Sequence, residues 1–174
     1  MKTEIVNLVA TATIGESVNL QELARLPYIT FNPSRYFCAY FKDESMESKV
    51  SLFPSGKMIA VGAKSEKSAK RDLRHVIHVL SKLEIVKKSK PTVTVQNIVV
   101  TIELHTSIHL EEMQESIPGI VYEPEQFPGA IFRPLESDVT VLIFASGRMV
   151  VAGIKSEGAV DNEVQTVLKE LNLD

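Results

Sequence analysis

Two short segments of this chain contain residue types that could bind phosphate or a metal ion. The segment from Gly56 to Ser65 resembles a phosphate-binding loop in its glycine, lysine and serine residues. However, five residues separate its glycines, and it ends Gly-Ala-Lys-Ser, whereas a phosphate-binding loop has fewer residues between its glycines and a lysine directly after the second. His105 and His109 stand at a predicted strand-to-helix junction without a cysteine nearby, so zinc binding is not expected. Neither segment predicts a ligand site.

The sequence also lacks the residue sets that are typical of enzymes. It has no serine, histidine and aspartate in a hydrolase-like order, no carboxylate pair in a pocket-like context and no cofactor fingerprint. Its single cysteine, Cys38, can form neither an internal disulfide nor a cysteine-based metal site, which fits a reducing compartment. We therefore expect no enzymatic activity, no cofactor and no metal.

The composition predicts a globular protein outside the membrane. Its 174 residues, 44% of them hydrophobic, can bury the core of one domain or of two small fused ones. No apolar run is long enough to span a membrane, and the N-terminus does not read as a secretion signal. We expect a soluble, intracellular protein.

The charge argues at first against a nucleic-acid partner, because most such domains are basic, whereas this chain has a net charge of -3 and an isoelectric point near 5.9. The charge is unevenly distributed, however. Lys64–Lys90 holds nine Lys or Arg and three Asp or Glu, whereas Lys155–Asp174 holds two and five. The balanced total therefore conceals two segments of opposite sign.

The chain contains an internal repeat. Phe53–Glu66 and Phe144–Glu157 lie 91 residues apart and are identical at eight of fourteen positions. Val6–Val9 and Gln96–Val99 are related by an offset of 90 residues, so one single-residue gap aligns almost the whole chain. This register indicates a duplication. We predict two tandem repeats, residues 1–90 and 91–174.

Each repeat has the same predicted order of elements: a strand, a short helix, a strand, a hairpin and a long helix. β-branched residues predict the strands, and Ser-Gly in the turn predicts each hairpin. The strands are expected at residues 5–13, 37–41, 50–53 and 57–62 of the first copy, and at 93–103, 130–132 and the Ser146-Gly147 hairpin of the second.

Capping residues and periodicity predict the helices. Asn19 with Glu22 indicates the start of a short helix, whose counterpart is residues 110–117. Ser65 and Ser156 are expected to cap the two long helices. One face of the first long helix is expected to carry Ala69, Leu73, Val76, Ile77, Leu80 and Leu83.

These elements predict the α+β class, with an antiparallel sheet covered by helices on one face. The other face would expose valine and isoleucine, which is an aggregation risk unless something binds there. Alternation along the strands places these residues on the uncovered face: Asn7, Val9, Thr11, Lys57, Ile59 and Val61 in the first copy, and Asn97, Val99, Thr101, Arg148, Val150 and Ala152 in the second.

The segments Tyr122–Gly129 and Leu142–Val150 closely resemble the second repeat of the TATA-box-binding protein family, and Phe53–Glu66 resembles the first. The resemblance covers nearly the full chain. It implies a pseudo-symmetric saddle, in which a curved antiparallel sheet faces DNA and helices cover the convex back. It also implies a general transcription initiation factor that binds A·T-rich (TATA) promoter DNA in the minor groove, bends it, and recruits transcription factor B and RNA polymerase.

The resemblance implies two aromatic wedges per repeat, which enter the minor groove and kink the duplex. Phe127 and Phe144 match the second pair, and Phe53 matches one of the first. The remaining position is Tyr36, whose hydroxyl would enter an apolar base step. Without the resemblance, these residues read as core aromatic side chains at strand ends.

Asn7 and Asn97 match a pair of asparagines that donate to adenine N3 and thymine O2, while Val9 and Val99 would crowd the amino group of guanine. A preference for A·T-rich DNA follows. Without the resemblance, each asparagine is only a solvated polar residue. The resemblance also assigns to DNA the rim cations Lys42, Lys57, Arg133 and Arg148, which could equally be plain surface charge, and the apolar Ile59, Leu142 and Val150.

The chain departs from the family pattern at several of these positions. Val61 and Ala152 replace threonines, and Ser51 replaces a leucine that is kept at Leu142. Because the departures cluster in the first repeat, we expect its half of the DNA site to be bound more loosely or with altered sequence preference.

The resemblance also assigns protein partners. Glu123 and Glu125 match acidic residues that face transcription factor B. A basic helix face matches a surface used by regulators, although such a face is also typical of plain solvent-exposed surface. It comprises Lys67, Lys70, Arg71 and Arg74.

The alternative is a protein-interaction module on the same fold, with weak or altered DNA binding. The retention of Asn7, Asn97 and three of the four wedge phenylalanines favours DNA. The first repeat begins at once, which indicates an archaeal-type minimal factor. We expect it in the cytoplasm, associated with the nucleoid, if it is archaeal and in the nucleus if it is eukaryotic.

Overall fold

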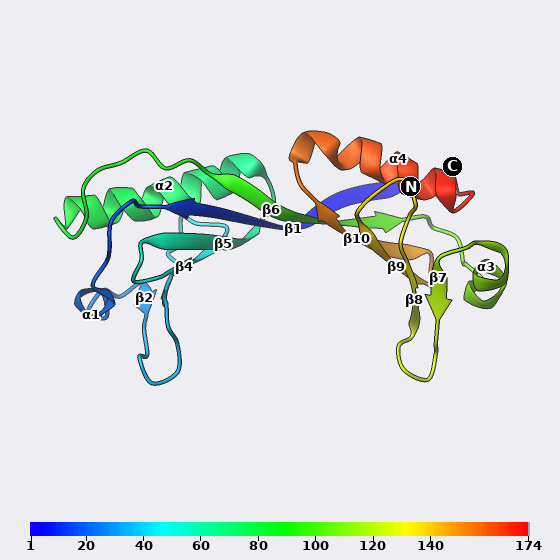
Figure 1. Ribbon diagram of the computed structural model, residues 1–174, viewed down its shortest axis with the longest axis horizontal. Coiled ribbons are helices and arrows are strands. Elements are labelled where there is room, and N and C mark those ends of the chain that lie inside the picture. The colour runs from blue at the N-terminus through cyan, green and yellow to red at the C-terminus, as the bar shows by residue number, and fades with distance from the viewer. Residues whose placement is uncertain (174) are drawn as a thin grey trace. The chain divides into compact units, whose positions relative to one another are not determined.

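The structure is a computed structural model that describes residues 1–173 (Figure 1). The first copy contains β1 (Lys2–Thr13), α1 (Leu20–Leu23), β2 (Ile29–Thr30), β3 (Ala39–Phe41), β4 (Lys49–Leu52), β5 (Lys57–Ala63) and α2 (Glu66–Lys82). The second contains β6 (Thr94–Glu103), α3 (Leu110–Ser116), β7 (Ile120–Tyr122), β8 (Gly129–Phe132), β9 (Thr140–Phe144), β10 (Arg148–Ile154), a 3-10 helix η1 (Glu157–Ala159) and α4 (Val160–Glu170). The two copies have the same order of strands and α-helices, and η1 has no counterpart in the first.

The described strands form one ten-stranded antiparallel sheet in the order β2-β3-β4-β5-β1-β6-β10-β9-β8-β7. The sheet and its helices confirm the predicted α+β class. Contacts in space divide the chain into two compact units: a first unit of Asn7–Gln96, and a second unit of Met1–Val6 with Asn97–Asp174. The predicted boundary between residues 90 and 91 follows the sequence repeat, and it stays a prediction.

In each unit one face of the strands is buried under helices. Leu8, Ala10 and Ala12 of β1 are buried, while the alternate residues are partly exposed. Helix α2 packs on β4 and β5, and α4 packs on β10 (Figure 1). The apolar face predicted for α2 is buried except at Leu83, which is 45% exposed because it lies just beyond the last helical residue.

The caps of the two long helices differ. The Ser65 side chain accepts a hydrogen bond from the backbone N–H of Ser68, as predicted. The prediction for Ser156 is wrong, because its side chain makes no capping hydrogen bond. The chain there enters the 3-10 turn η1, which contains Gly158, before α4 begins at Val160. Asn19 caps α1 as predicted, accepting from the N–H of Gln21.

The two hairpin turns require glycine. Gly56 has a φ of +79° and Gly147 a φ of +84°. A Cβ on Gly56 would lie 2.1 Å from the carbonyl oxygen of Glu16, and one on Gly147 would lie 2.0 Å from that of Thr106. The hairpins therefore press directly against the loop that follows the first strand of each copy.

The predicted strand at residues 37–41 is shorter in the structure. Strand β3 begins at Ala39, and Phe37 lies in the preceding loop with 91% of its surface exposed. Its hydrophobicity suggested a strand residue, but the loop between β2 and β3 extends as far as Cys38.

Candidate nucleic-acid interface

The first unit has an uncovered sheet face built from two cross-strand rows. In one row Thr11, Ile59, Ser51 and Tyr40 stand opposite one another on β1, β5, β4 and β3. In the other row Val9, Val61 and Lys49 do so. Val61 is 42% exposed, and Lys49 is exposed. These two rows therefore combine apolar side chains with hydroxyl groups and Lys49, and the exposed Lys57 lies on the same side of β5.

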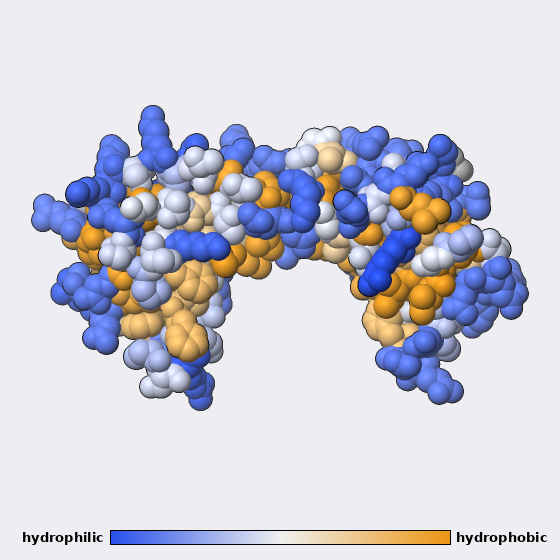
Figure 2. Space-filling view, viewed as in Figure 1, coloured by the Kyte–Doolittle hydropathy of each residue, from blue (hydrophilic) through white to orange (hydrophobic). Residues whose placement is uncertain are grey.

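The second unit has the equivalent rows with different side chains. Thr101, Val150, Leu142 and Ile131 form the first row on β6, β10, β9 and β8. Val99, Ala152 and Thr140 form the second. Thr101 is nearly buried, whereas Ile131 is 36% exposed. Apolar side chains reach the surface in both units (Figure 2), but this face is the more apolar of the two.

Asn7 and Asn97 occupy the same local structure in the two units. The register shifts between Leu8 and Val9 and again between Ala152 and Ile154. At each shift a glycine with positive φ, Gly62 at +99° or Gly153 at +118°, is the extra residue of a β-bulge. The N–H of Gly62 donates to Asn7 Oδ1 at 2.9 Å, and the N–H of Gly153 donates to Asn97 Oδ1 at 2.8 Å.

This hydrogen bond fixes which end of each amide is available. A backbone N–H can only donate, so the amide oxygen must face it. The Nδ2 group, which carries two donor hydrogens, is then left at the other end of the amide. Each unit therefore presents a fixed donor at the edge of its uncovered face.

Two aromatic rings pack together in the second unit. Phe127 and Phe144 are both half-buried, with ring centroids 5.8 Å apart and planes at 66°. A Cβ on Gly129 would lie 2.9 Å from Phe127 Cε1 and 3.1 Å from Phe144 Cε1. The pair therefore depends on the absence of a side chain at position 129.

The corresponding rings of the first unit pack differently. Cys38 stands where the second copy has Gly129, and its Cβ occupies the equivalent position. Tyr36 packs against Tyr40, with centroids 5.3 Å apart and an edge-to-face angle of 79°. Lys49 Nζ lies 5.1 Å from the centroid of the Tyr40 ring. A hydrogen bond with the side chain of Cys38 is the main cause that raises the pKa of Tyr40.

The four rim cations have different surroundings. Lys57 and Arg133 are exposed. The ammonium group of Lys42 donates to the carbonyl of Met46 and, at 2.8 Å, to that of Glu47, so it is held by its own loop. Arg148 Nε lies 3.2 Å from Glu103 Oε1.

The predicted partner-binding residues lie on exposed surface. Glu123 and Glu125 are exposed in a turn that is closed by hydrogen bonds from the N–H groups of Gln126 and Phe127 to the Glu123 carbonyl. On α2, Lys67 and Arg74 are exposed. Lys70 pairs with Glu66 at 3.1 Å, and Arg71 pairs with Asp72 at 2.9 Å.

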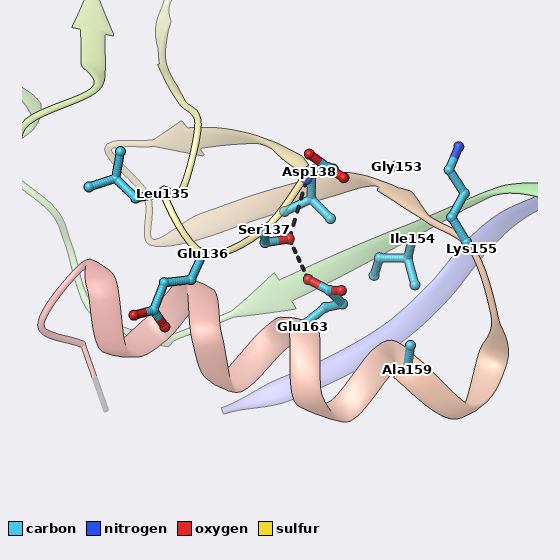
Figure 3. A pocket seen from close by; sticks show the side chains of 10 residues that line it. Leu135, Glu136, Ser137, Asp138, Gly153, Ile154, Lys155, Ala159 and Glu163 are labelled. Atoms are coloured by element: carbon cyan, nitrogen blue, oxygen red, sulfur yellow. Dashed lines mark hydrogen bonds between the residues drawn. The ribbon is translucent and has the colours of Figure 1, made fainter.

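Carboxylates of the long helices hold the loop that precedes β4 or β9. In the first unit, the N–H and Oγ of Ser48 both donate to Asp72 Oδ2 at 2.7 Å, and both residues are buried. In the second unit, Ser137 donates to Glu163 beside a hollow of about 430 Å³ (Figure 3). Asp72 and Glu163 are counterparts in the repeat, so this hollow belongs to a structural loop anchor.

Sequence reasoning missed the residues that orient the site. Gly62 and Gly153 align in the repeat and lie on β5 and β10, which pair with the strands of the two asparagines. A recurring glycine alone does not indicate which acceptor its N–H will bind. The repeat aligns Cys38 with Gly129, but the sequence does not indicate that two aromatic rings lie within 3.1 Å of a Cβ at position 129. Lys49 stands just before the strand predicted at residues 50–53 and is the first residue of β4 in the structure.

Residues 1–173 contain no group of three or more His, Cys, Asp or Glu side chains able to hold a metal ion. In the same range, no helix has the length and apolar character needed to cross a membrane.

Two copies of one α+β unit, each with an uncovered sheet face and a fixed asparagine donor, define a duplicated sheet protein. Its fold is that of Methanococcus jannaschii TBP, which aligns with a TM-score of 0.87 over 99% of each chain at 31% identity. Residues 2–83 and 92–173 match the family described as "Transcription factor TFIID (or TATA-binding protein, TBP)".

Full-length relatives agree with this match. The TATA-box-binding protein of Sulfolobus acidocaldarius is 35% identical over 168 residues, which cover 96% of this chain and 85% of that protein. That of Haloarcula marismortui is 34% identical over 172 residues, which cover 97% and 92%. The chain belongs to the TATA-binding protein family. This is a family of transcription factors and not of enzymes. The match confirms the predicted membership of this family and the prediction that the chain is not an enzyme.

Proposed function

We propose that the uncovered faces of both units bind the minor groove of A·T-rich promoter DNA, and that the protein acts there as a transcription initiation factor. The observation that carries this proposal is the repeated asparagine–glycine bulge. The same donor is fixed by the same hydrogen bond in both units, at 2.9 Å and 2.8 Å. Membership of the TATA-binding protein family supports the choice of promoter DNA.

The donors and their apolar neighbours together select A·T base pairs. Adenine N3 and thymine O2 are acceptors that an Nδ2 group can bind, and guanine adds an amino donor to the same groove. Val9 and Val99 lie two residues beyond the asparagines on the same face and offer that amino group no acceptor. A buried donor without a partner weakens binding.

The aromatic rings at the ends of the faces bend the DNA. Phe127 and Phe144 in the second unit, and Phe53 with Tyr36 in the first, insert at base steps and open the groove toward the sheet. The T-shaped packing of Phe127 on Phe144 holds the two rings as one rigid wedge. Lys57, Arg133, Arg148 and Lys42 contact phosphates and position the duplex.

Protein partners bind outside the DNA face. The exposed Glu123 and Glu125 bind transcription factor B, which brings RNA polymerase to the promoter inside the cell. The exposed Lys67 and Arg74 on α2, with Lys70 and Arg71, bind acidic regulators. The acidic turn and the basic helix lie in different units, so they give the protein a direction.

Replacement of the asparagines by aspartate tests the donor role. Asn7→Asp and Asn97→Asp keep the oxygen that accepts from glycine but replace the donor by an acceptor. We expect each change to weaken binding to a TATA-containing duplex at least about tenfold, measured by gel shift at fixed salt against a scrambled duplex. Asn162→Asp makes the same charge change at an exposed position on α4 and should change binding less than about twofold. Wild-type affinity in both test variants would refute the donor role.

A bending measurement tests the wedge. The DNA carries a pair of dyes for energy transfer, which reports the distance between its ends, and is saturated with protein. The Phe127→Ala/Phe144→Ala variant should bend this duplex less than the wild type. Leu135→Ala removes an apolar side chain that is 88% exposed in a loop and serves as the matched control. Equal bending by all three proteins would discard the wedge mechanism.

A further inference from the structure

The uncovered faces of the two units differ in their capacity to accept hydrogen bonds. In the outer half of one row, on β4 and β3, Ser51 and Tyr40 of the first unit stand where the second unit has Leu142 and Ile131 on β9 and β8. In the other row, Lys49 stands where the second unit has Thr140. The register of both units is the same, so these are exchanges at equivalent points of the face.

The exchange alters what the face can do with a G·C pair. In the minor groove, G·C differs from A·T by the guanine amino group, which is a donor. Leu142 and Ile131 have no acceptor for it and would bury it without a partner, at a cost in affinity. The Ser51 hydroxyl has two lone pairs and the Tyr40 hydroxyl is also an acceptor. Serine is also smaller than leucine and leaves room for the amino group.

The cation offsets the smaller apolar contact. Lys49 lies over the Tyr40 ring, 5.1 Å from its centroid, and Tyr40 in turn packs on Tyr36. Lys49, Tyr40 and Ser51 thus form a continuous polar track across β4 and β3, and Tyr36 packs against it from the loop before β3. An ammonium group attracts phosphates and groove acceptors whatever the base pair.

We propose that the polar track of Lys49, Tyr40 and Ser51 makes the first unit tolerant of G·C base pairs, while the second unit accepts only A·T. This inference rests on the proposed minor-groove function. Its consequence is a protein that binds an asymmetric site, with its first unit over the half that contains G·C. The base composition of the site then orients the protein before any partner binds.

The test starts from a palindromic duplex of A·T pairs only, and one G·C pair is then placed either in one half or in both halves at symmetric positions. The wild type can place its first unit over a single G·C pair, so that pair should cost less than about threefold in affinity. A pair in both halves should cost about tenfold or more, because a mismatched pair typically costs roughly 5- to 150-fold.

Reciprocal variants test whether the polar track, and no other difference between the units, causes the tolerance of a G·C pair. Tyr40→Ile/Lys49→Thr/Ser51→Leu carries the side chains of the second unit, and a single G·C pair should then cost about tenfold or more. Ile131→Tyr/Thr140→Lys/Leu142→Ser should tolerate G·C in both halves. Circular dichroism and binding to the all-A·T duplex check that each variant folds.

Three results would overturn the inference while leaving the proposed function intact: a wild-type protein that penalises a single G·C pair tenfold, one that tolerates G·C in both halves, or a first-unit variant that behaves as the wild type. Failure of the wild type to distinguish the A·T duplex from a scrambled one would instead remove the proposed function itself.

Discussion

Removal of the Asp72 carboxylate should destabilise the first unit more than any comparable change in the second. Ser48 donates to Asp72 Oδ2 from its backbone N–H and its hydroxyl, both at 2.7 Å, and Arg71 donates to Oδ1 at 3.0 and 2.9 Å. Ser48 and Asp72 are both 0% exposed. In Asp72→Ala two buried donors lose their acceptor at about 1–3 kcal/mol each, so we expect a loss of about 2–6 kcal/mol.

Urea unfolding measures this loss, followed by circular dichroism and by tyrosine fluorescence. Tyr28, Tyr36 and Tyr40, three of the four tyrosines, lie in the first unit and report on it. The matched control is Glu163→Ala, since Glu163 is only half-buried and accepts from the Ser137 hydroxyl; it should cost about 1 kcal/mol. A loss for Asp72→Ala within about 1 kcal/mol of that for Glu163→Ala would refute the reasoning.

Three further predictions follow from local geometry. Partial burial alone would raise the pKa of Asp43, but hydrogen bonds from Ser45 and from His75, whose Nε2 lies 2.6 Å away, lower it. The carboxylate therefore stabilises the fold fully above its unfolded pKa of about 3.9. In acid-unfolding titrations the stability difference between wild type and Asp43→Asn should shrink below that value and vanish as the pH falls through the lower pKa of the folded state. Gly147→Ala should lower the free energy of unfolding by about 3 kcal/mol or more. The control is Gly158→Ala, whose added Cβ would meet no heavy atom within 4 Å, and it should change the free energy of unfolding by less than about 1 kcal/mol. Equal effects of the two variants in denaturant melts would contradict the hairpin contact. Lys57→Ala should reduce the slope of log affinity against log salt by about 0.9, the value of one phosphate contact, and an unchanged slope would remove Lys57 from the interface.

The fold could be predicted from the sequence because the duplication repeats every local signal. The Ser-Gly turns and Ser65 each have an identical counterpart 91 residues later, so an uncertain signal in one copy is supported by the other, whereas Asn19 aligns with His109, which makes no side-chain capping bond. The errors lie where the copies differ. Ser156 aligns with the cap Ser65, but Gly158 follows it where the first copy has Lys67, and a 3-10 turn replaces the first helical turn.

The site was predictable as a set of faces and not as a set of contacts. Alternation on β1 and β6 is enough to place Asn7 and Asn97 on the uncovered side. Which end of each amide faces outward depends on the β-bulges at Gly62 and Gly153. A bulge is a feature of how two strands pair, so the sequence of one strand does not reveal it. The packing of Tyr36 on Tyr40, in place of a pair like Phe127 and Phe144, likewise follows from contacts in space that no sequence pattern gives.

The central claim is that the protein reads A·T pairs in the minor groove. The most direct test changes the chemical groups of one DNA groove without changing those of the other. Inosine lacks the amino group of guanine, so an inosine–cytosine pair resembles A·T in the minor groove and G·C in the major groove. We predict that a TATA-containing duplex in which every A·T pair is replaced by inosine–cytosine binds within about threefold of the original, whereas replacement by G·C weakens binding about a hundredfold or more. Equally weak binding to the inosine and guanine duplexes would show that the protein does not read the minor groove.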